Sequence, residues 1–467
     1  MMYRFVNVFR AQVSSRLGAL YLATRAKRLA SHPRTCHNTL LVWPYRSQTI
    51  MRSHPIFLAH VACVASSAIP WHQQCWQQSP LYILSLQTSL DGSQDFASCS
   101  PSSHISDIQD EQQESPYAPW SHQPLCTPHL PGLNDTLCIY TDSAFSQGRG
   151  ISIVTTPSLA QQFAALPAFL KPSALASSDI NTPTNIYTAT SIPGKGIGML
   201  ATRPLNFGDT VTSYTPAFIA YLESELSTLD REQLWRIAIE QLPEGLREGF
   251  LGLATVYGDE RVKVQDVVKA NTFQVLVRGR NHLAVWPETS RLNHACAPNA
   301  QYVIDTSLLT HTVRVTRPIA AGEEITISYT SPIEPTPERQ QHLQAGFHFT
   351  CTCPRCTSPS SDATLSHIHS LQSQLNDWSP TSSASPAMAE GLLTIYRGEG
   401  LEGFMDVAYG FAALAHSAVG DAEKAVDFAK KAQEAILMKD GMWTENWKIW
   451  EELIGDVEAH WSWRRRL

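Results

Sequence analysis

The sequence lacks several features whose absence excludes whole classes of protein. No apolar run reaches the roughly 18–20 residues that a membrane-spanning helix needs. Charged residues make up only 16% of the 467 residues, and the net charge of −7 has the wrong sign for a general nucleic-acid surface. We therefore expect no membrane span and no direct nucleic-acid site. The 43% hydrophobic content supports a sizeable core in two or three domains.

Residues 1–90 contain no Asp or Glu, the first acid being Asp91, but they carry nine Lys or Arg. The first 28 residues, where these cations alternate with apolar residues and serines, have the composition of a mitochondrial transit peptide. A second candidate begins at Met51, where Arg52 precedes the apolar stretch 56–68, as in a short secretory signal. The two interpretations are incompatible, and a misassigned start codon would explain both.

The ten cysteines fall into two groups. Four of them lie inside short motifs described below, and the other six follow no metal-binding spacing. A disulfide within this second group would require an oxidising compartment, so we expect free or disordered thiols there. The second group is Cys36, Cys63, Cys75, Cys99, Cys126 and Cys138.

Composition and periodicity divide the chain. Residues 70–135 are rich in Ser, Pro, Gln and His, so we expect 1–135 to be a poorly ordered lead-in, with order beginning near Leu137. Strands and a helix are expected in 136–186, and strands with a helical insert at about 222–257 in 187–330. After a Ser/Pro-rich linker, 404–419 and 422–439 form a predicted helical hairpin with alanines at the contact. This hairpin resembles one tetratricopeptide unit, which cannot bury its apolar face alone.

Four short motifs follow one another between Gly194 and Cys356. They are GKGIG at 194–198, RLNHACAPN at 291–299, GEEITISY at 322–329 and CTCPRC at 351–356. A glycine turn lets the backbone approach a ligand closely, but alone it is a weak signal, and GRGI at 148–151 is a similar run. The cysteine run has a metal spacing.

The cysteine run indicates a metal site. Cys351, Cys353 and Cys356 offer three thiolates, and zinc strongly prefers four tetrahedral ligands. A fourth ligand is therefore required, and Cys296 in the NHACAPN run is the natural one. Four protein ligands leave no open position for chemistry, so we expect one structural Zn²⁺ that pins 351–356 against 293–299.

In this order the four motifs resemble those of SET-domain protein lysine methyltransferases, ending in the zinc-binding post-SET segment. The likeness covers about 187–356 and is nearest to the SET-and-MYND branch, although no Cys/His cluster for a MYND finger lies between Gly198 and Asn271. It implies a mainly β SET fold of small curved sheets with a pseudoknot in 187–330. It also implies a pre-SET part in 136–186, a post-SET zinc segment in 331–357 and an α-helical C-terminal region in 358–467.

The resemblance implies S-adenosyl-L-methionine as the cofactor and Tyr329 as the catalytic residue. At the position of Phe347 the family often has Tyr, so one hydroxyl group is missing here. The same resemblance makes Cys296 a zinc ligand. The residues that it implies in cofactor binding are Lys195, Gly196, Ile197, Asn271, Asn293, His294, Phe347 and Phe349.

The implied reaction transfers a methyl group to a protein lysine, of a histone or of another protein. A free lysine has a pKa near 10.4 and is almost wholly charged at neutral pH, so a narrow apolar channel would have to select the neutral amine. Tyr329 would then hold that amine. The C-terminal helices are expected to form one wall of the substrate groove. The resemblance also favours a monomer in the nucleus or cytoplasm; the alternative is a catalytically silent SET fold that acts as an interaction module.

Overall fold

The computed structural model describes residues 117–176 and 179–467, so both candidate targeting segments lie outside the described residues. Ordered structure begins earlier than the predicted Leu137, because the indole of Trp120 is buried against Tyr140 and Phe169, with ring centroids 5.2 and 5.5 Å away. The lead-in predicted for 1–135 is therefore too long at its C-terminal end. A single buried tryptophan in a polar stretch produces no periodic pattern of apolar residues, so the sequence alone does not reveal it.

A six-stranded sheet contains the N-terminal part of the described chain. Its order is β1 (Leu125–Cys126), β2 (Cys138–Asp142), β3 (Ile151–Thr155), β7 (Phe218–Tyr221), β9 (Arg280–Val285) and β8 (Phe273–Val277). Only β3 and β7 run parallel. Every residue of β2 and β3 is buried, as expected of strands covered on both faces.

Two smaller sheets complete the β structure. One has the order β10 (Asn293–His294), β13 (Glu324–Ile327), β5 (Gly196–Ala201) and β4 (Tyr187–Ile192), and the other β11 (Ala300–Asp305), β12 (Thr310–Val315) and β6 (Thr210–Tyr214). Their inner faces share one apolar core that includes Met199, Val211, Val313 and Ile325. The small sheets predicted for 187–330 are thus confirmed.

Helices cover the six-stranded sheet. The N-terminal part contributes α3 (Phe145–Gly148), α4 (Pro157–Ala164), α5 (Pro167–Leu170) and the 3₁₀ turn η1 (Pro172–Leu175). The insert contains α6 (Thr228–Glu240) and α7 (Glu244–Leu251), within the predicted 222–257. It continues through η2 (Glu260–Val262) into α8 (Lys263–Asn271), a helix that was not expected. Leu234, Phe250 and Val267 bury their side chains against the sheet residues Phe218 and Leu283.

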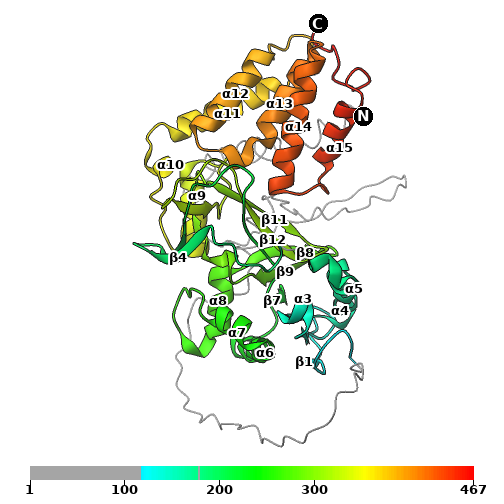
Figure 1. Cartoon of the computed structure of the whole chain (residues 1–467), viewed down its shortest axis with the longest axis vertical. Coiled ribbons are helices and arrows are strands. Elements are labelled where there is room, and N and C mark those ends of the chain that lie inside the picture. The colour runs from blue at the N-terminus through cyan, green and yellow to red at the C-terminus, as the bar shows by residue number, and fades with distance from the viewer. Residues whose placement is uncertain (1–116, 177–178) are drawn as a thin grey trace, which may run out of the picture. The chain divides into compact units, whose positions relative to one another are not determined.

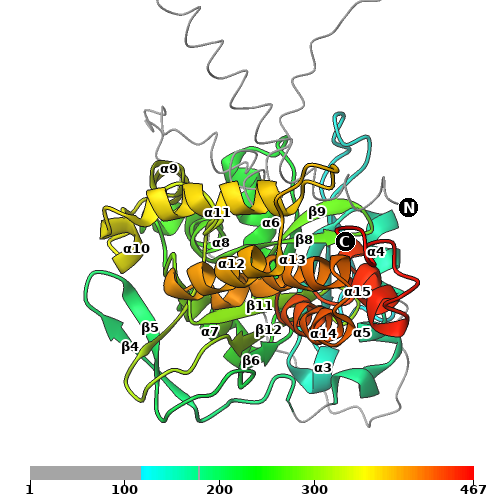
Figure 2. The same ribbon diagram turned by 90° about the horizontal axis from the view of Figure 1, so that it is seen from above.

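The C-terminal region is helical, as Figures 1 and 2 show. The helices are α9 (Thr336–Phe347), α10 (Pro354–Thr357), α11 (Ser361–Leu375), α12 (Pro386–Gly398), η4 (Glu402–Phe404), α13 (Met405–Ala418), α14 (Ala422–Lys439) and α15 (Glu445–Gly455). The hairpin of α13 and α14 is confirmed, whereas its likeness to a tetratricopeptide unit stays a prediction. The Ser/Pro-rich linker expected after Cys356 is the short connection between α10 and α11, and α11 buries Leu365, Ile368 and Leu375.

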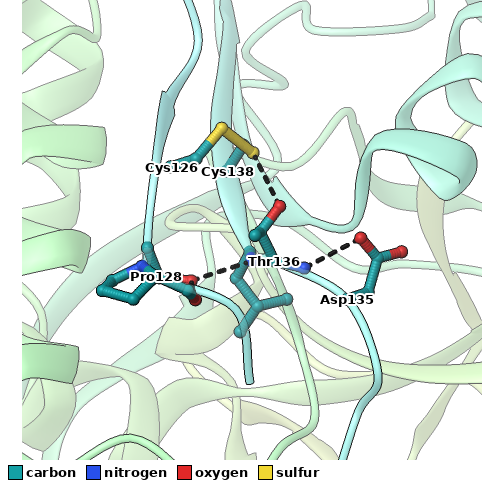
Figure 3. The surroundings of a disulfide bond; sticks show 7 residues. Cys126, Pro128, Asp135, Thr136 and Cys138 are labelled. Carbon is teal, nitrogen blue, oxygen red and sulfur yellow. Dashed lines mark hydrogen bonds between the residues drawn. A yellow bond between two sulfur atoms is a disulfide. The ribbon is translucent and has the colours of Figure 1, made fainter. Parts of the chain in front are cut away.

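One cysteine pair differs from expectation. Cys126 and Cys138 are register partners in β1 and β2 and form a disulfide (Figure 3). The free thiols predicted at these two positions are therefore wrong; spacing along the chain carries no information on cross-strand pairing. In the described part of the chain, no helix combines the length and the apolar character needed to cross a membrane.

Candidate functional site

The strands β10 and β13 bring two of the motifs together. They pair in parallel, Asn293 opposite Thr326 and His294 opposite Ile327. The side chain of Asn299 reinforces this pairing: its Nδ2 donates to the Glu324 carbonyl at 2.8 Å, and its Oδ1 accepts from the Thr326 N–H at 2.8 Å. Segments about thirty residues apart in sequence thereby become one surface.

Tyr329 follows β13 and is held at both ends. Its backbone N–H donates to His294 Nδ1 at 3.0 Å, and its hydroxyl donates to the Leu292 carbonyl. Its ring lies 4.7 Å from that of Phe347 and 6.5 Å from that of Phe349. Burial, with a smaller contribution from the Glu324 carboxylate, raises the pKa of Tyr329, so the phenol stays neutral at physiological pH.

His294 connects Tyr329 to the cysteine run. Because Nδ1 accepts a backbone N–H, the ring proton must lie on Nε2, which is 3.2 Å from Cys296 Sγ and donates to it. Burial lowers the pKa of His294 to about 3, which keeps the ring neutral. The ring is 6.0 Å from Phe349. His294, Phe347 and Phe349 thus surround Tyr329, and Asn293 precedes His294 in β10.

The glycine turn joins this group through Glu324. Glu324 Oε2 lies 2.6 Å from Lys195 Nζ, and its Oε1 accepts from Asn293 Nδ2 at 2.9 Å. Gly198 must lack a side chain, because a Cβ there would lie 2.6 Å from Asn293 Nδ2 and 2.9 Å from Glu324 Oε1. Gly196 has a φ of 78°, a conformation that favours glycine. Ile197 beside it is exposed.

Asn271 is placed differently from the other predicted cofactor residues. It ends α8, and its Nδ2 donates to the carbonyls of Ala254 and Val267 at 2.8 and 2.7 Å. Its carbonyl accepts from Ser290 Oγ at 3.1 Å, in the 3₁₀ turn η3 (Thr289–Arg291) that precedes Leu292. No hydrogen bond among the described residues links its side chain to Lys195, Asn293 or His294.

The four predicted metal ligands form one cluster. The Sγ atoms of Cys296, Cys351, Cys353 and Cys356 all lie within 4.8 Å of one another, and those of Cys296 and Cys356 are 3.4 Å apart. A tetrahedron with Zn–S bonds of about 2.3 Å has edges of roughly 3.8 Å, so the arrangement fits one zinc ion. Cys296 comes from the NHACAPN loop and the others from the segment after α9. A metal here would cross-link the two.

Two buried arginines, Arg339 and Arg355, contact residues of this cluster. Arg339 of α9 is fully buried, with its Nη2 3.8 Å from Cys356 Sγ, where its charge offsets that of the thiolates. Arg355 Nη1 donates to the carbonyls of Cys296 and Pro332 at 3.0 and 2.8 Å, and its Nε lies 2.9 Å from Glu399 Oε2. The C-terminal helices are therefore bonded to the loop that carries Cys296.

Three of these residues had no predicted role. Glu324 and Arg355 stand inside the motifs, so their positions were visible, but their partners are not encoded locally. Arg339 lies in a helix of weak amphipathicity, and only its burial singles it out. A charge at a buried helical position becomes recognisable only once the packing is known.

Residues 196–330 match the family model of the SET domain. The chain contains a SET domain. It is 26% identical over 293 residues to the histone-lysine N-methyltransferase set5 of Schizosaccharomyces pombe, which covers 59% of this chain and 86% of that protein. It is 34% identical over 113 residues to a SET and MYND domain-containing protein of Dictyostelium discoideum, and 32% over 106 residues to the human N-lysine methyltransferase SMYD2.

The last two similarities are local. They cover 24% and 22% of this chain and 26% and 24% of those proteins, so the chain spans about a quarter of their length. Among solved structures, the SET domain of LSMT bound to lysine and AdoHcy gives a TM-score of 0.24 at 12% identity, over 66% of this chain and 90% of that one.

Proposed function

We propose that this SET-domain protein transfers a methyl group from S-adenosyl-L-methionine to a lysine side chain of another protein. The observation that supports the proposal most is the position of Tyr329. Its hydroxyl donates to the carbonyl of Leu292, next to Asn293 and His294, and its side chain packs against the cluster that contains Cys296 and Cys351. The SET-domain match of residues 196–330 supports the same reaction.

The hydrogen bonding of Tyr329 suits this role. Its proton is directed to the Leu292 carbonyl, so the lone pairs of its oxygen are left to accept a hydrogen bond from an incoming amine. The rings of Phe347 and Phe349 supply apolar walls that disfavour the charged form of lysine and exclude water. The chain thereby orients a neutral amine, which is most of what this displacement requires.

The residues that would hold the cofactor are Lys195, Gly196, Ile197, Asn293, His294, Phe347 and Phe349. Asn271 would act indirectly, because its backbone carbonyl accepts a hydrogen bond from Ser290 in η3. When bound, S-adenosyl-L-methionine supplies an electrophilic methyl group. Lys195 and Asn293 already share the Glu324 carboxylate, so Glu324 fixes their relative position. The four thiols would hold one zinc ion with no open position, which gives the metal a structural role only.

A catalytically silent interaction module is the second candidate, because Lys195, Asn293 and the Tyr329 hydroxyl are all bonded within the protein. Cofactor affinity separates the two. A histone or non-histone acceptor, a monomeric state and a nuclear or cytoplasmic location are part of the proposal and rest on the family resemblance.

Tyr329→Phe tests the mechanism. We expect affinity for S-adenosyl-L-methionine within about threefold of the wild type and methyl transfer at least about a hundredfold slower, because one oriented hydrogen-bonding group is lost. Tyr409→Phe in α13 is the matched control and should leave both unchanged. Calorimetry measures binding, and radiolabelled methyl transfer to a peptide library measures turnover. Unchanged turnover in Tyr329→Phe would remove Tyr329 from the mechanism.

A further inference from the structure

A cavity of about 600 Å³ lies outside the four motifs. It is open to solvent on one side and is lined by residues of α3 and the loop after it, by the segment around η1, by α7 and by residues 287–288. Its size is that of a site for a small ligand or for a few side chains of a peptide. Most of its wall precedes residue 196 or belongs to the insert, so it is not one of the motif-built parts of the SET domain.

One wall carries a fixed ion pair. Arg149 lies over the ring of Tyr214, 5.1 Å from its centroid, and its Nε and Nη2 donate to the Thr215 carbonyl at 3.4 and 3.3 Å. Its Nη2 is also 2.7 Å from Glu288 Oε2. Arg149 is thereby satisfied, whereas Glu288 Oε1 has no hydrogen-bond partner among the described residues. Glu288 keeps a quarter of its side chain exposed and can accept a further hydrogen bond.

Another wall is formed by α7, where Gly245 and Gly249 line the cavity together with Leu246. Gly245 and Gly249 are four residues apart and therefore share one face of the helix. A Cβ at Gly245 would have nothing within 4 Å, and one at Gly249 would only touch Pro287 Cβ at 3.9 Å. Neither glycine is required by close packing, and together they keep the cavity open. Glu244 and Glu248, one residue before each glycine, are exposed.

The cavity and the candidate active centre share one segment of chain. Residues 287–288 line the cavity, and the single turn η3 separates them from Leu292, whose carbonyl accepts the Tyr329 hydroxyl. Burial raises the pKa of Tyr187 and the Glu288 carboxylate raises it further, and Tyr187 packs against the same apolar core as Tyr329. A bound peptide that occupies the cavity could therefore extend to the candidate active centre through only a few more residues.

We propose that this cavity binds the segment of the protein substrate that adjoins the methylated lysine, and that this segment carries a second basic side chain, which pairs with Glu288. The inference rests on the proposed methyl transfer. A basic segment is favoured because Arg149 is already paired, whereas Glu288 in the cavity wall keeps an acceptor oxygen for a further partner. A peptide backbone can approach α7 closely at Gly245 and Gly249, because neither residue has a side chain.

The test uses the full chain and two fluorescent peptides, each with one central lysine flanked by glycines and either two arginines or two glutamates. Fluorescence anisotropy measures binding to the wild type and to Gly245→Leu, Gly249→Leu and Glu288→Gln. Gly391→Leu in α12 is the control, because a Cβ there also has nothing within 4 Å but lies away from the cavity.

We expect the arginine peptide to bind the wild type at least about tenfold more tightly than the glutamate peptide. Gly249→Leu and Gly245→Leu should weaken its binding by about tenfold or more, because the new side chain fills the cavity, and Gly391→Leu should not change it. Glu288→Gln should remove most of the preference for arginine. Wild-type affinity in both glycine variants, or no preference between the peptides, would overturn the proposal.

Titration of S-adenosyl-L-methionine into the same proteins separates this inference from the proposed function. Cofactor binding that is unaffected by Gly249→Leu, together with lost peptide binding, supports both. No cofactor binding in any of the proteins would refute the methyl transfer and with it this role of the cavity. Normal cofactor binding with unaltered peptide binding in the variants would refute the cavity alone.

Discussion

The candidate active centre and the hairpin of α13 and α14 are held together in opposite ways. In the centre, three motifs that are distant in sequence meet through polar contacts of Lys195, Asn293, Glu324 and Tyr329 and through a cluster of thiols. In the hairpin, two helices that are adjacent in sequence meet through small side chains that are 0–1% exposed: Ala408, Ala412, Ala415, Ala425, Ala429 and Ala432.

The difference shows which forces each region depends on. The hairpin closes a turn of a few residues and packs alanines, so its stability comes from local contacts and burial. The centre must close loops of about thirty residues or more around buried polar groups, each of which needs its partner. We therefore expect the centre to depend on its metal and the hairpin to be independent of it.

Cys353→Ser should have the largest effect. Removing one of four thiolates should abolish stoichiometric zinc binding, and structural zinc contributes on the order of 10 kcal/mol in small metal-binding peptides. We expect about one zinc per wild-type chain, and a variant that is insoluble or is cleaved near residues 293–299 and 351–356 while 405–439 resists protease. Elemental analysis and mass-mapped proteolysis measure both.

Thr352→Ser is the control, since Thr352 lies between two of the cysteines and is exposed. A soluble Cys353→Ser protein with full zinc content would contradict the cluster. If protease cleaved residues 405–439 of this variant as fast as residues 293–299 and 351–356, the hairpin would not be independent of the metal site.

The β structure around His311 in β12 should become less stable in acid. His311 is fully buried against Phe273 and Tyr302, and burial lowers its pKa to about 3 from 6.5. The folded state therefore binds fewer protons than the unfolded state between these pH values, and the free energy of unfolding falls as pH drops below 6.5. Relative to His311→Phe, the wild type should lose about 2 kcal/mol between pH 7 and pH 5.

Urea unfolding at the two pH values measures this loss, and His367→Phe, at an exposed position of α11, should leave it unchanged. An equal pH dependence in the wild type and His311→Phe would show that His311 is not buried as a neutral ring.

The stability of the hairpin region should depend on side-chain volume at its helix contacts. A Cβ on Gly410 of α13 would lie 2.5 Å from the Trp450 indole of α15, so Gly410→Ala should lower the free energy of unfolding by about 1–2 kcal/mol, overpacking outweighing the gain in helix propensity. Gly391→Ala in α12, where a Cβ meets nothing, should raise it by up to about 1 kcal/mol. Thermal unfolding measures the stability of both variants, and elemental analysis measures their zinc content. A change in zinc content in either variant would show that the stability of the hairpin and metal binding at the candidate active centre are not independent.

The same contrast governs what could be predicted from the sequence. The hairpin follows from local periodicity, and its predicted ends differ from the structure by one residue at most. The motifs predicted Tyr329 and the four cysteines because each is a short local pattern. The bridging role of Glu324 could not be predicted, since it depends on β13 lying between β10 and β5.

Other omissions have the same cause. The disulfide between Cys126 and Cys138 depends on cross-strand register, and the burial of Arg339 and Arg355 depends on where α9 and α10 pack. Local patterns in the sequence predicted the helical hairpin and the candidate site residues, whereas the contacts between distant polar groups required the three-dimensional arrangement.

We propose that segments 293–299 and 351–356, which a zinc ion would join, together form the cofactor site. Calorimetric titration of S-adenosyl-L-methionine into the zinc-loaded chain, and into the same protein after chelation, tests it most directly. We predict one site of micromolar affinity in the loaded protein and at least about a tenfold loss after chelation, with restoration on adding zinc. No binding to a folded, zinc-loaded chain, or equal binding with and without zinc, would contradict it.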